Sequence, residues 1–405
     1  MKICQINCVY GEGSTGKIVK DIHQTLLENN YDSICITPIT PEHCALDAGV
    51  YSVSNKFLSK LSAIYRRLLG LQFDGAYIQT SRIIKILKKE EPNVVHLHCI
   101  NGNNINVYRL YDYLANNHIK TILTLHAEFP YTGGCGHAYD CLQWETGCEK
   151  CPILREATQS IFFDFTKRTW KKQKNCYDKF EREELIITAV SPWLISRAQK
   201  SPMLSRFSMI PVLNGVDTTV FYPHKNSGWR EKLGIKKEEK ILFYATASFR
   251  PYEDNLKGGK YILQLADMLR EEKVKIVVAA NFAQVDQLPE NVIYIGRTKT
   301  QIELAELYSE ADLSVITSKR ETFSMPVAES LCCGTPIVGF EAGGPESIAM
   351  QEYSEFVEYG NVNALAMVVD KWLQKSYDAS KMSHEASTLY SKETMTSNYL
   401  KVYNK

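Results

Sequence analysis

Several features that mark other classes of protein are missing from this 405-residue sequence. It has no apolar run near the ~18 residues that a membrane-spanning helix needs, and polar residues interrupt its first segment too early for a secretory signal. Its net charge is only +1, so no overall basic field favours nucleic acid. Short repeats and low-complexity stretches are also absent. These absences favour a cytoplasmic globular protein without a nucleic-acid partner.

Strand and helix signals alternate along the chain in two successive rounds. The first half has buried-strand patterns at 2–9, 93–98, 120–126 and 185–190. The second half has them at 241–246, 274–280, 292–295, 313–317 and 336–340. Such alternation is typical of parallel sheets covered by helices on both faces. We therefore predict an α/β protein of two doubly wound, Rossmann-like domains, 1–217 and 218–405, with the last helix a candidate to pack back on the first.

Two glutamates flank a turn that opens a helix in the second half. Glu321 follows a predicted strand, and Glu329 lies about one turn inside a helix whose start is marked by Ser324 and Pro326. A helix N-terminus at the end of a strand favours an anionic phosphate. Glu329 can then accept hydrogen bonds from a ribose diol, and Glu321 from sugar hydroxyls. The alternative is one glutamate that complements the helix dipole and one ordinary surface glutamate.

With Gly334-Thr335-Pro336 after it, this segment resembles the motif of retaining glycosyltransferase family 4, and the chain is similar to bacterial exopolysaccharide- and capsule-type members. The resemblance covers nearly the whole chain. It implies the GT-B fold, in which two Rossmann-like domains face a central cleft. It also implies that Glu321 contacts the donor sugar and Glu329 the ribose, with further donor-binding residues at the turn: Phe323, Ser324 and Met325. The family commonly has glycine where this chain has Thr322 and Ser324, so the backbone approach to the sugar differs.

A basic loop follows the strand predicted at 241–246. The family usually places an Arg and a Lys-Gly pair here to neutralise the donor diphosphate; Lys257-Gly258 matches this pattern well and Arg250 with looser spacing. The sequence has no Asp-x-Asp motif, which is the usual carboxylate cage for a metal bound to a diphosphate. We therefore expect these cations to stabilise the leaving diphosphate without a catalytic metal or other cofactor. The alternative is a solvated basic loop.

Two features of the first domain also resemble active-site elements of the family. A glycine-rich loop after the first strand supplies Gly13 and Gly16, which the resemblance places beside donor and acceptor; the alternative is an ordinary strand-to-helix turn. This loop is not a P-loop, because the residue after its lysine is neither Ser nor Thr. His126 follows a predicted strand and matches the family's histidine near the reacting sugar. His98 is a second candidate on the acceptor side, and His96 is expected in the core.

Four of the twelve cysteines lie in one glycine-rich segment of the first domain, 132–152. Their spacing is C-x5-C-x6-C-x2-C, at Cys135, Cys141, Cys148 and Cys151. Four thiolates suit a structural zinc ion, and the last pair has the spacing of a zinc half-site. Disulfides are the alternative, although they are unusual in a cytosolic chain. In either case we expect this segment to have no part in catalysis.

Two stretches combine basic and aromatic side chains, 56–69 and 161–182. Helices of this composition can lie on an anionic membrane surface. The alternative is an ordinary amphipathic helix with a solvated charged face. A peripheral contact with the inner face of a membrane therefore stays open beside a purely cytoplasmic location.

These residues, together with the resemblance, predict a glycosyltransferase of the EC 2.4 class. It would move a sugar, with retention, from a nucleoside-diphosphate sugar to a hydroxyl of a glycan or lipid-linked acceptor, in surface polysaccharide biosynthesis. Two alternatives stay open. One is a sugar-nucleotide 2-epimerase of the same fold, which needs no acceptor. The other is a protein that binds nucleotide sugars without turnover.

Overall fold

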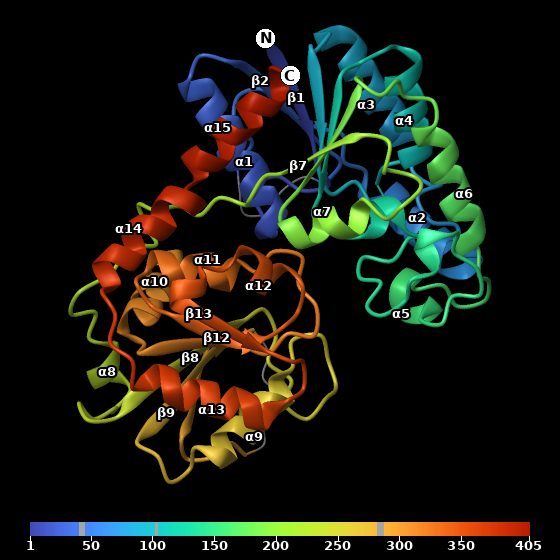
Figure 1. Cartoon of the computed structure of the whole chain (residues 1–405). Coiled ribbons are helices and arrows are strands. Elements are labelled where there is room, and N and C mark those ends of the chain that lie inside the picture. The colour runs from blue at the N-terminus through green and yellow to red at the C-terminus, as the bar shows by residue number, and fades with distance from the viewer. Residues whose placement is uncertain (40–44, 102–103, 282–286) are drawn as a thin grey trace. The chain divides into compact units, whose positions relative to one another are not determined.

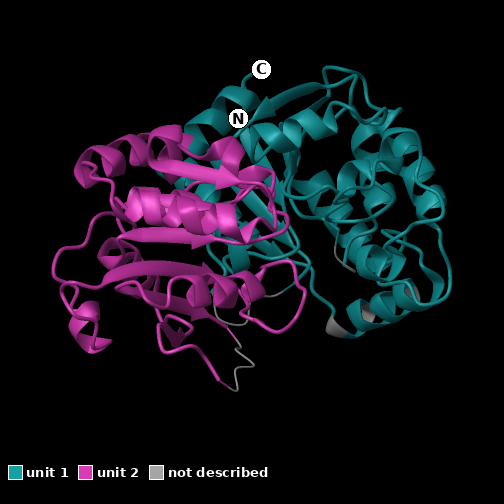
Figure 2. Ribbon diagram, turned by 60° about the horizontal axis from the view of Figure 1, so that its bottom comes forward, with its two compact units in different colours: residues 1–213, 395–405 teal, residues 214–394 magenta. Residues whose placement is uncertain are grey.

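The computed structural model describes residues 1–39, 45–101, 104–281 and 287–405. These residues form two compact units (Figure 2). Unit 1 comprises Met1–Leu213 and Met395–Lys405, and unit 2 comprises Asn214–Thr394. The last residues of the chain therefore belong to the same unit as the first.

Unit 1 is built on a seven-stranded parallel sheet with the strand order β3-β2-β1-β4-β5-β6-β7. Its strands are β1 (Lys2–Ile6), β2 (Asp32–Thr37), β3 (Val50–Ser52), β4 (Val94–Leu97), β5 (Thr121–Leu125), β6 (Leu185–Ala189) and β7 (Ser208–Pro211). The central strands β4, β5 and β6 are buried along their whole length, as expected for a sheet with helices on both faces. The order reverses between β1 and β4, which pair directly.

The helices of unit 1 are α1 (Gly13–Glu28), α2 (Lys56–Leu69), α3 (Tyr77–Glu90), α4 (Val107–Asn116), α5 (Leu154–Thr158), α6 (Thr166–Tyr177) and α7 (Pro192–Ala198). Helix α15 (Lys392–Tyr403) closes the same core (red in Figure 1). Its Tyr399 and Tyr403 are buried in a cluster with Ile3 of β1 and Ile22 of α1. The end of the chain is thus a structural part of the first sheet's core.

Unit 2 has a six-stranded parallel sheet with the order β10-β9-β8-β11-β12-β13. Its strands are β8 (Lys240–Thr246), β9 (Val274–Ala280), β10 (Val292–Gly296), β11 (Leu313–Ile316), β12 (Ile337–Phe340) and β13 (Ser354–Val357). Its helices are α8 (Trp229–Lys232), α9 (Gly259–Met268), α10 (Gln301–Glu310), α11 (Met325–Cys332), α12 (Gly344–Ile348), α13 (Val362–Leu373) and α14 (Ala379–Tyr390). Buried residues of α9 and α13 pack with the sheet in one apolar cluster.

Each unit is a parallel, helix-covered sheet whose strand order reverses once, so the prediction of two doubly wound α/β domains is confirmed. The prediction omits four of the observed strands. Three of these, β3, β7 and β13, lie at sheet edges and are mostly half-exposed, so they lack an unbroken apolar run. The fourth, β2, begins with the polar pair Asp32 and Ser33, which shortens its apolar run.

Candidate active site

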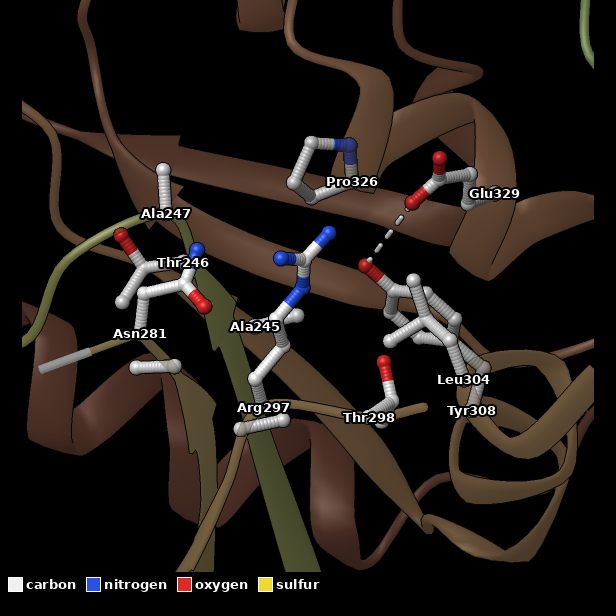
Figure 3. Close-up of a pocket in the computed structure, with 12 residues that line it drawn as sticks. Ala245, Thr246, Ala247, Asn281, Arg297, Thr298, Leu304, Tyr308, Pro326 and Glu329 are labelled. Carbon is white, nitrogen blue, oxygen red and sulfur yellow. Dashed lines mark hydrogen bonds between the residues drawn. The ribbon is translucent and has the colours of Figure 1, made fainter. Parts of the chain in front are cut away.

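A pocket of about 200 Å³ lies in unit 2 where β8, β9 and β10 end (Figure 3). The strand ends contribute Ala245–Ala247, Ala279–Asn281 and Arg297–Thr298, and helices α10 and α11 contribute Leu304, Tyr308, Pro326 and Glu329. Because β8 pairs with both β9 and β11, the pocket lies beside the point where the strand order reverses. Ligands of doubly wound sheets bind at this place.

Glu329 lines the pocket from α11. The hydroxyl of Tyr308 donates a hydrogen bond to Glu329 Oε2 at 3.4 Å, shown as the dashed line in Figure 3. Burial, and secondarily the charge of Glu329, raises the pKa of Tyr308 well above its ordinary value, so the phenol stays protonated and can only act as a donor toward the carboxylate. The bond is long for two oxygens, and a ligand hydroxyl can therefore compete for the carboxylate.

Arg297 directly follows β10, and its guanidinium points into the same pocket, toward Pro326 and Glu329 (Figure 3). Our sequence analysis did not single it out, because it belongs to no motif. The only available signal was its position just after a predicted strand. A guanidinium offers a planar set of donors that suits phosphate oxygens or the carbonyl edge of a base.

Lys257 and Glu321 form an ion pair with 2.6 Å between Nζ and Oε1. The two residues follow different strands, β8 and β11. The family resemblance implies that Lys257 binds the diphosphate of the donor and that Glu321 binds its sugar. Both side chains are partly exposed, 29% and 20%, so a ligand can reach them. The structure therefore brings together two residues whose proposed roles require them to be neighbours.

The backbone before α9 holds Lys257 in this place. Gly258 has φ 67°, and a Cβ there would lie 2.0 Å from the carbonyl oxygen of Thr317, so no other residue fits. The carbonyl oxygen of Lys257 accepts hydrogen bonds from the Tyr244 hydroxyl at 2.7 Å and the Thr317 hydroxyl at 3.0 Å. The Lys-Gly pair therefore permits a close approach between the β8–α9 loop and the end of β11.

The loop that carries Glu321 is fixed on its other side. The N–H of Glu321 donates to the carbonyl oxygen of Ala342 at 3.0 Å, and the N–H of Gly344 donates to that of Glu321 at 2.9 Å. A Cβ at Gly344 would lie 2.4 Å from the carbonyl carbon of Thr322. This contact leaves the Glu321 loop little freedom, which suits a carboxylate that must be held ready for a substrate.

Ser324 precedes the first residue of α11, as the sequence analysis expected. Within the described residues, however, its side chain makes no capping hydrogen bond. Its backbone has φ 84° and ψ 89°, in the left-handed region that favours glycine. Ser324 thus adopts a conformation suited to the glycine that the resemblance leads one to expect here. Phe323 is buried beside it, and Met325 begins the helix.

Arg250 lies in the same loop as Lys257. Its guanidinium pairs with Glu253 at 3.2 Å, and 54% of its side chain is exposed. The structure does not bring Arg250 into the Lys257–Glu321 pair, so its role at the diphosphate stays a prediction.

Three histidines of unit 1 lie close together: His96 lies within β4, and His98 and His126 directly follow β4 and β5. His98 Nδ1 and His126 Nε2 are 3.1 Å apart, while His96 bonds to Tyr403 and Thr124 and belongs to the core. Burial lowers the pKa of His126 to about 4. His126 is therefore neutral near pH 7 and can exchange hydrogen bonds without carrying charge.

Helix α1 begins at Gly13, inside the glycine loop of unit 1. Gly13 has φ 65°, with open space where a Cβ would point. At Gly16 a Cβ would lie 3.1 Å from Val9 Cγ2, and the N–H of Gly11 donates to the Gly16 carbonyl at 2.9 Å. The loop folds tightly over the helix start, and whether it also binds a ligand stays a prediction.

The four cysteines of segment 132–152 line one small cavity of unit 1. This cavity shares no lining residue with the pocket of unit 2. The cluster is therefore not part of the donor pocket.

The two doubly wound sheets, with a pocket at the strand ends of unit 2, place the chain in the Rossmann-like α/β class. Residues 226–388 match the model of a family described as glycosyl transferases group 1. The matched segment lies within unit 2, and the predicted resemblance to glycosyltransferases is confirmed.

Curated relatives match part of the chain. The chain is 27% identical over 192 residues to the N-acetyl-alpha-D-glucosaminyl L-malate synthase of Bacillus anthracis, covering 45% of this chain and 48% of the relative. It is 24% identical over 277 residues to the MMP alpha-(1->4)-mannosyltransferase of Mycolicibacterium hassiacum, covering 63% of each. The chain therefore spans about half to nearly two thirds of these relatives.

Solved structures resemble the whole chain in fold. A glycosyltransferase from Rickettsia africae has a TM-score of 0.70 at 14% identity, covering 100% of this chain and 97% of its own. HepE from Anabaena, solved in complex with UDP and glucose, has a TM-score of 0.67 at 13% identity, covering 100% of both chains. At these identities the likeness concerns the fold alone, and it confirms the predicted GT-B fold class.

None of the described helices combines the length and the apolar character needed to cross a membrane.

Proposed function

We propose that this protein is an enzyme that transfers a glycosyl group from a nucleoside-diphosphate sugar to an acceptor hydroxyl, with retention at the anomeric carbon. The observation that carries the proposal is the arrangement in unit 2. The Glu329 pocket and the Lys257–Glu321 pair both follow the carboxyl ends of strands in one sheet. The group 1 family match of this unit and a relative named as a mannosyltransferase support it.

We propose that each chemical group of the donor is bound by a different set of these residues. Glu329 accepts hydrogen bonds from the ribose hydroxyls, and Arg297 binds the base edge or a phosphate in the same pocket. Lys257, assisted by Arg250 and the N-terminus of α11, holds the diphosphate. Glu321 contacts the sugar. The loop residues Phe323, Ser324 and Met325 shape the approach to it.

In the transfer, the bond between the anomeric carbon and the diphosphate oxygen breaks while a bond to the acceptor oxygen forms on the same face. The acceptor proton passes to the departing phosphate. Positive charge grows on the sugar ring and negative charge on the leaving group, so Glu321 and Lys257 stabilise opposite ends of the same charge separation. His126, Gly13 and Gly16 of unit 1 act near the acceptor. We propose no metal or other cofactor for this step.

Nucleoside diphosphates should raise the thermal unfolding midpoint, because they bind the native state only. We expect one of UDP, GDP or ADP to do so, with an equal shift after brief addition of EDTA, since fixed cations replace a metal. Differential scanning fluorimetry, with the free protein scanned with and without EDTA as the control, measures both effects. No shift with any of the three contradicts nucleotide binding, and a shift that only Mg²⁺ or Mn²⁺ restores contradicts metal independence.

We further propose that the acceptor is a glycan or a lipid-linked sugar of surface polysaccharide biosynthesis, reached at an anionic membrane surface. Helix α2 exposes an apolar stripe at helical spacing: Phe57, Leu61, Ile64 and Leu68. The sequence of α2 contains basic residues but no acidic ones. The segment with exposed Phe162 and Phe163 adjoins its end, where the N–H of Ile161 bonds to the Arg67 carbonyl at 2.9 Å. An apolar stripe with a basic border suits insertion at an anionic interface.

The double substitution Phe57→Glu/Ile64→Glu should weaken binding to vesicles that contain anionic lipid. Losing one buried large apolar side chain costs about 1.5–3 kcal/mol, so we expect at least a roughly tenfold loss. Met367→Glu, at a 75%-exposed methionine of unit 2, is the matched control and should bind like wild type. Co-sedimentation measures binding. Equal binding of both variants, or no binding by wild type, contradicts the membrane contact.

A further inference from the structure

A second cavity lies in unit 1, and none of the residues assigned to the transfer reaction lines it. The cavity measures about 20 Å³, which is room for a single water-sized occupant. All four cysteines of the 132–152 segment line it: Cys135, Cys141, Cys148 and Cys151. The other residues around it are uncharged. The four cysteines thus share the lining of one small cavity.

A backbone N–H group near the cysteines donates a hydrogen bond to one of the sulfur atoms. The N–H of Gly133 donates to Cys148 Sγ at 3.1 Å. A Cβ at Gly133 would lie 2.8 Å from Cys148 Cβ, so only glycine allows this N–H to approach. The same N–H can donate to the sulfur of a metal-bound cysteine, as outer contacts to metal ligands commonly do.

Hydrogen bonds outside the cavity fix the rest of the segment. The N–H of Cys151 donates to Asp164 Oδ2 at 2.6 Å, and Asp164 also accepts from the N–H of Thr166 at 2.9 Å. The Trp144 indole donates to the carbonyl of Cys141 at 2.8 Å. These contacts attach the cysteine segment to the start of α6, so the four cysteines are held near one another by the surrounding structure.

Disulfides do not explain the cluster, because all four cysteines are free. The sulfur atoms are not yet arranged as a finished cage: among the described residues, no three His, Cys, Asp or Glu side chains are already placed to hold a metal ion. The position of a cysteine sulfur depends on a single side-chain torsion, however, so rotation among staggered positions redirects it without moving the backbone. We expect such rotations to bring the four thiols toward a common point in the cavity.

We propose that Cys135, Cys141, Cys148 and Cys151 bind one zinc ion in a tetrahedral Cys4 site. Each thiol releases a proton to solvent as it binds, and the sulfur atoms settle at about 2.3 Å from the metal. The ion joins four positions of the 132–152 segment, which follows β5, to one another. It is structural, because its four ligands leave no open position for a substrate. The site goes beyond the proposed transferase function, none of whose steps uses it.

Protein purified without added metal or chelator should contain about one zinc ion per chain by elemental analysis. Cys148→Ser should lose the zinc and lower the thermal midpoint. Cys176→Ser is the matched control, because Cys176 is also buried in unit 1 but lies outside the cavity; this variant should keep the zinc.

Wild-type protein provides a readout that does not depend on how the variant folds. A mercurial reagent should release the zinc, and Co²⁺ in its place should give the visible absorption of tetrahedral thiolate coordination. The proposal is overturned by a zinc-free folded protein whose cluster thiols react freely, by a mass that shows disulfides in the segment, or by full zinc content in Cys148→Ser.

Discussion

Glu321→Ala is expected to lower kcat by roughly 10²–10³, about the loss seen when one preorganised electrostatic contact is removed from an active site. The physical reason is that a carboxylate stabilises the sugar ring more as the ring gains positive charge than in the bound donor. The donor KM should change little. Steady-state kinetics with the donor and an acceptor measures both kcat and the donor KM.

The ion pair makes a second, independent prediction about this variant. Lys257 lies 2.6 Å from Glu321, and without that carboxylate its ammonium is no longer neutralised. Binding of the free nucleoside diphosphate, which carries no sugar, should therefore stay the same or become tighter. Calorimetry tests this. Full turnover by Glu321→Ala, or a loss of nucleotide binding, contradicts the assignment.

Glu271→Ala is the matched control for charge removal. Glu271 is exposed and precedes β9, so it lies at the edge of the sheet opposite the pocket, and both its kinetics and its nucleotide binding should equal those of wild type. The same assays separate the functional alternatives. A sugar-nucleotide 2-epimerase forms product from the donor alone, whereas a binding protein forms none with any acceptor.

Glu329→Ala should weaken nucleoside diphosphate binding by about 10–100-fold, because hydrogen bonds to a charged group contribute about 1.5–3 kcal/mol each. This contact is made equally in the ground state and the transition state, so the loss should fall on the donor KM and leave kcat nearly unchanged. Glu329 therefore differs from Glu321 in which kinetic constant it controls. Calorimetry and steady-state kinetics on the two variants measure the contrast.

A 2′-deoxynucleoside diphosphate makes the ribose assignment sharper. Wild type should bind the deoxy ligand more weakly than the ribose ligand, while Glu329→Ala should bind the two about equally, because the protein partner of the hydroxyl is gone. Tyr308→Phe is a useful companion, since it removes the 3.4 Å hydrogen bond to Glu329 but keeps the ring. If Glu329→Ala still discriminates between the two ligands, the ribose lies elsewhere.

Much of the candidate site could be predicted because its residues belong to local motifs. The segment with Glu321 and Glu329, and the Lys257-Gly258 pair, are recognisable within a few residues of sequence. Arg297 could not be found in this way. It has no motif partner, and only the folding of β10 beside β9 and β8 brings its guanidinium into the pocket. The side chain of Ser324 also differs from expectation, since the left-handed backbone there replaces the capping bond that its residue type suggested.

The sequence by itself determined the class of fold, because alternating apolar strands and amphipathic helices leave a chain few ways other than parallel sheets to bury its apolar surface. It also determined which residue types carry the chemistry. Only the tertiary structure decided which of these residues contact one another. The Lys257–Glu321 pair joins residues that follow two different strands. The contact depends on a close backbone approach at Gly258, where a Cβ would lie 2.0 Å from the carbonyl oxygen of Thr317, and no local pattern reveals this approach. It likewise decided which residues of the last helix, among them Tyr399 and Tyr403, complete the first sheet's core. Contacts between distant segments depend on packing complementarity, which is a property of the folded surfaces rather than of any stretch of sequence.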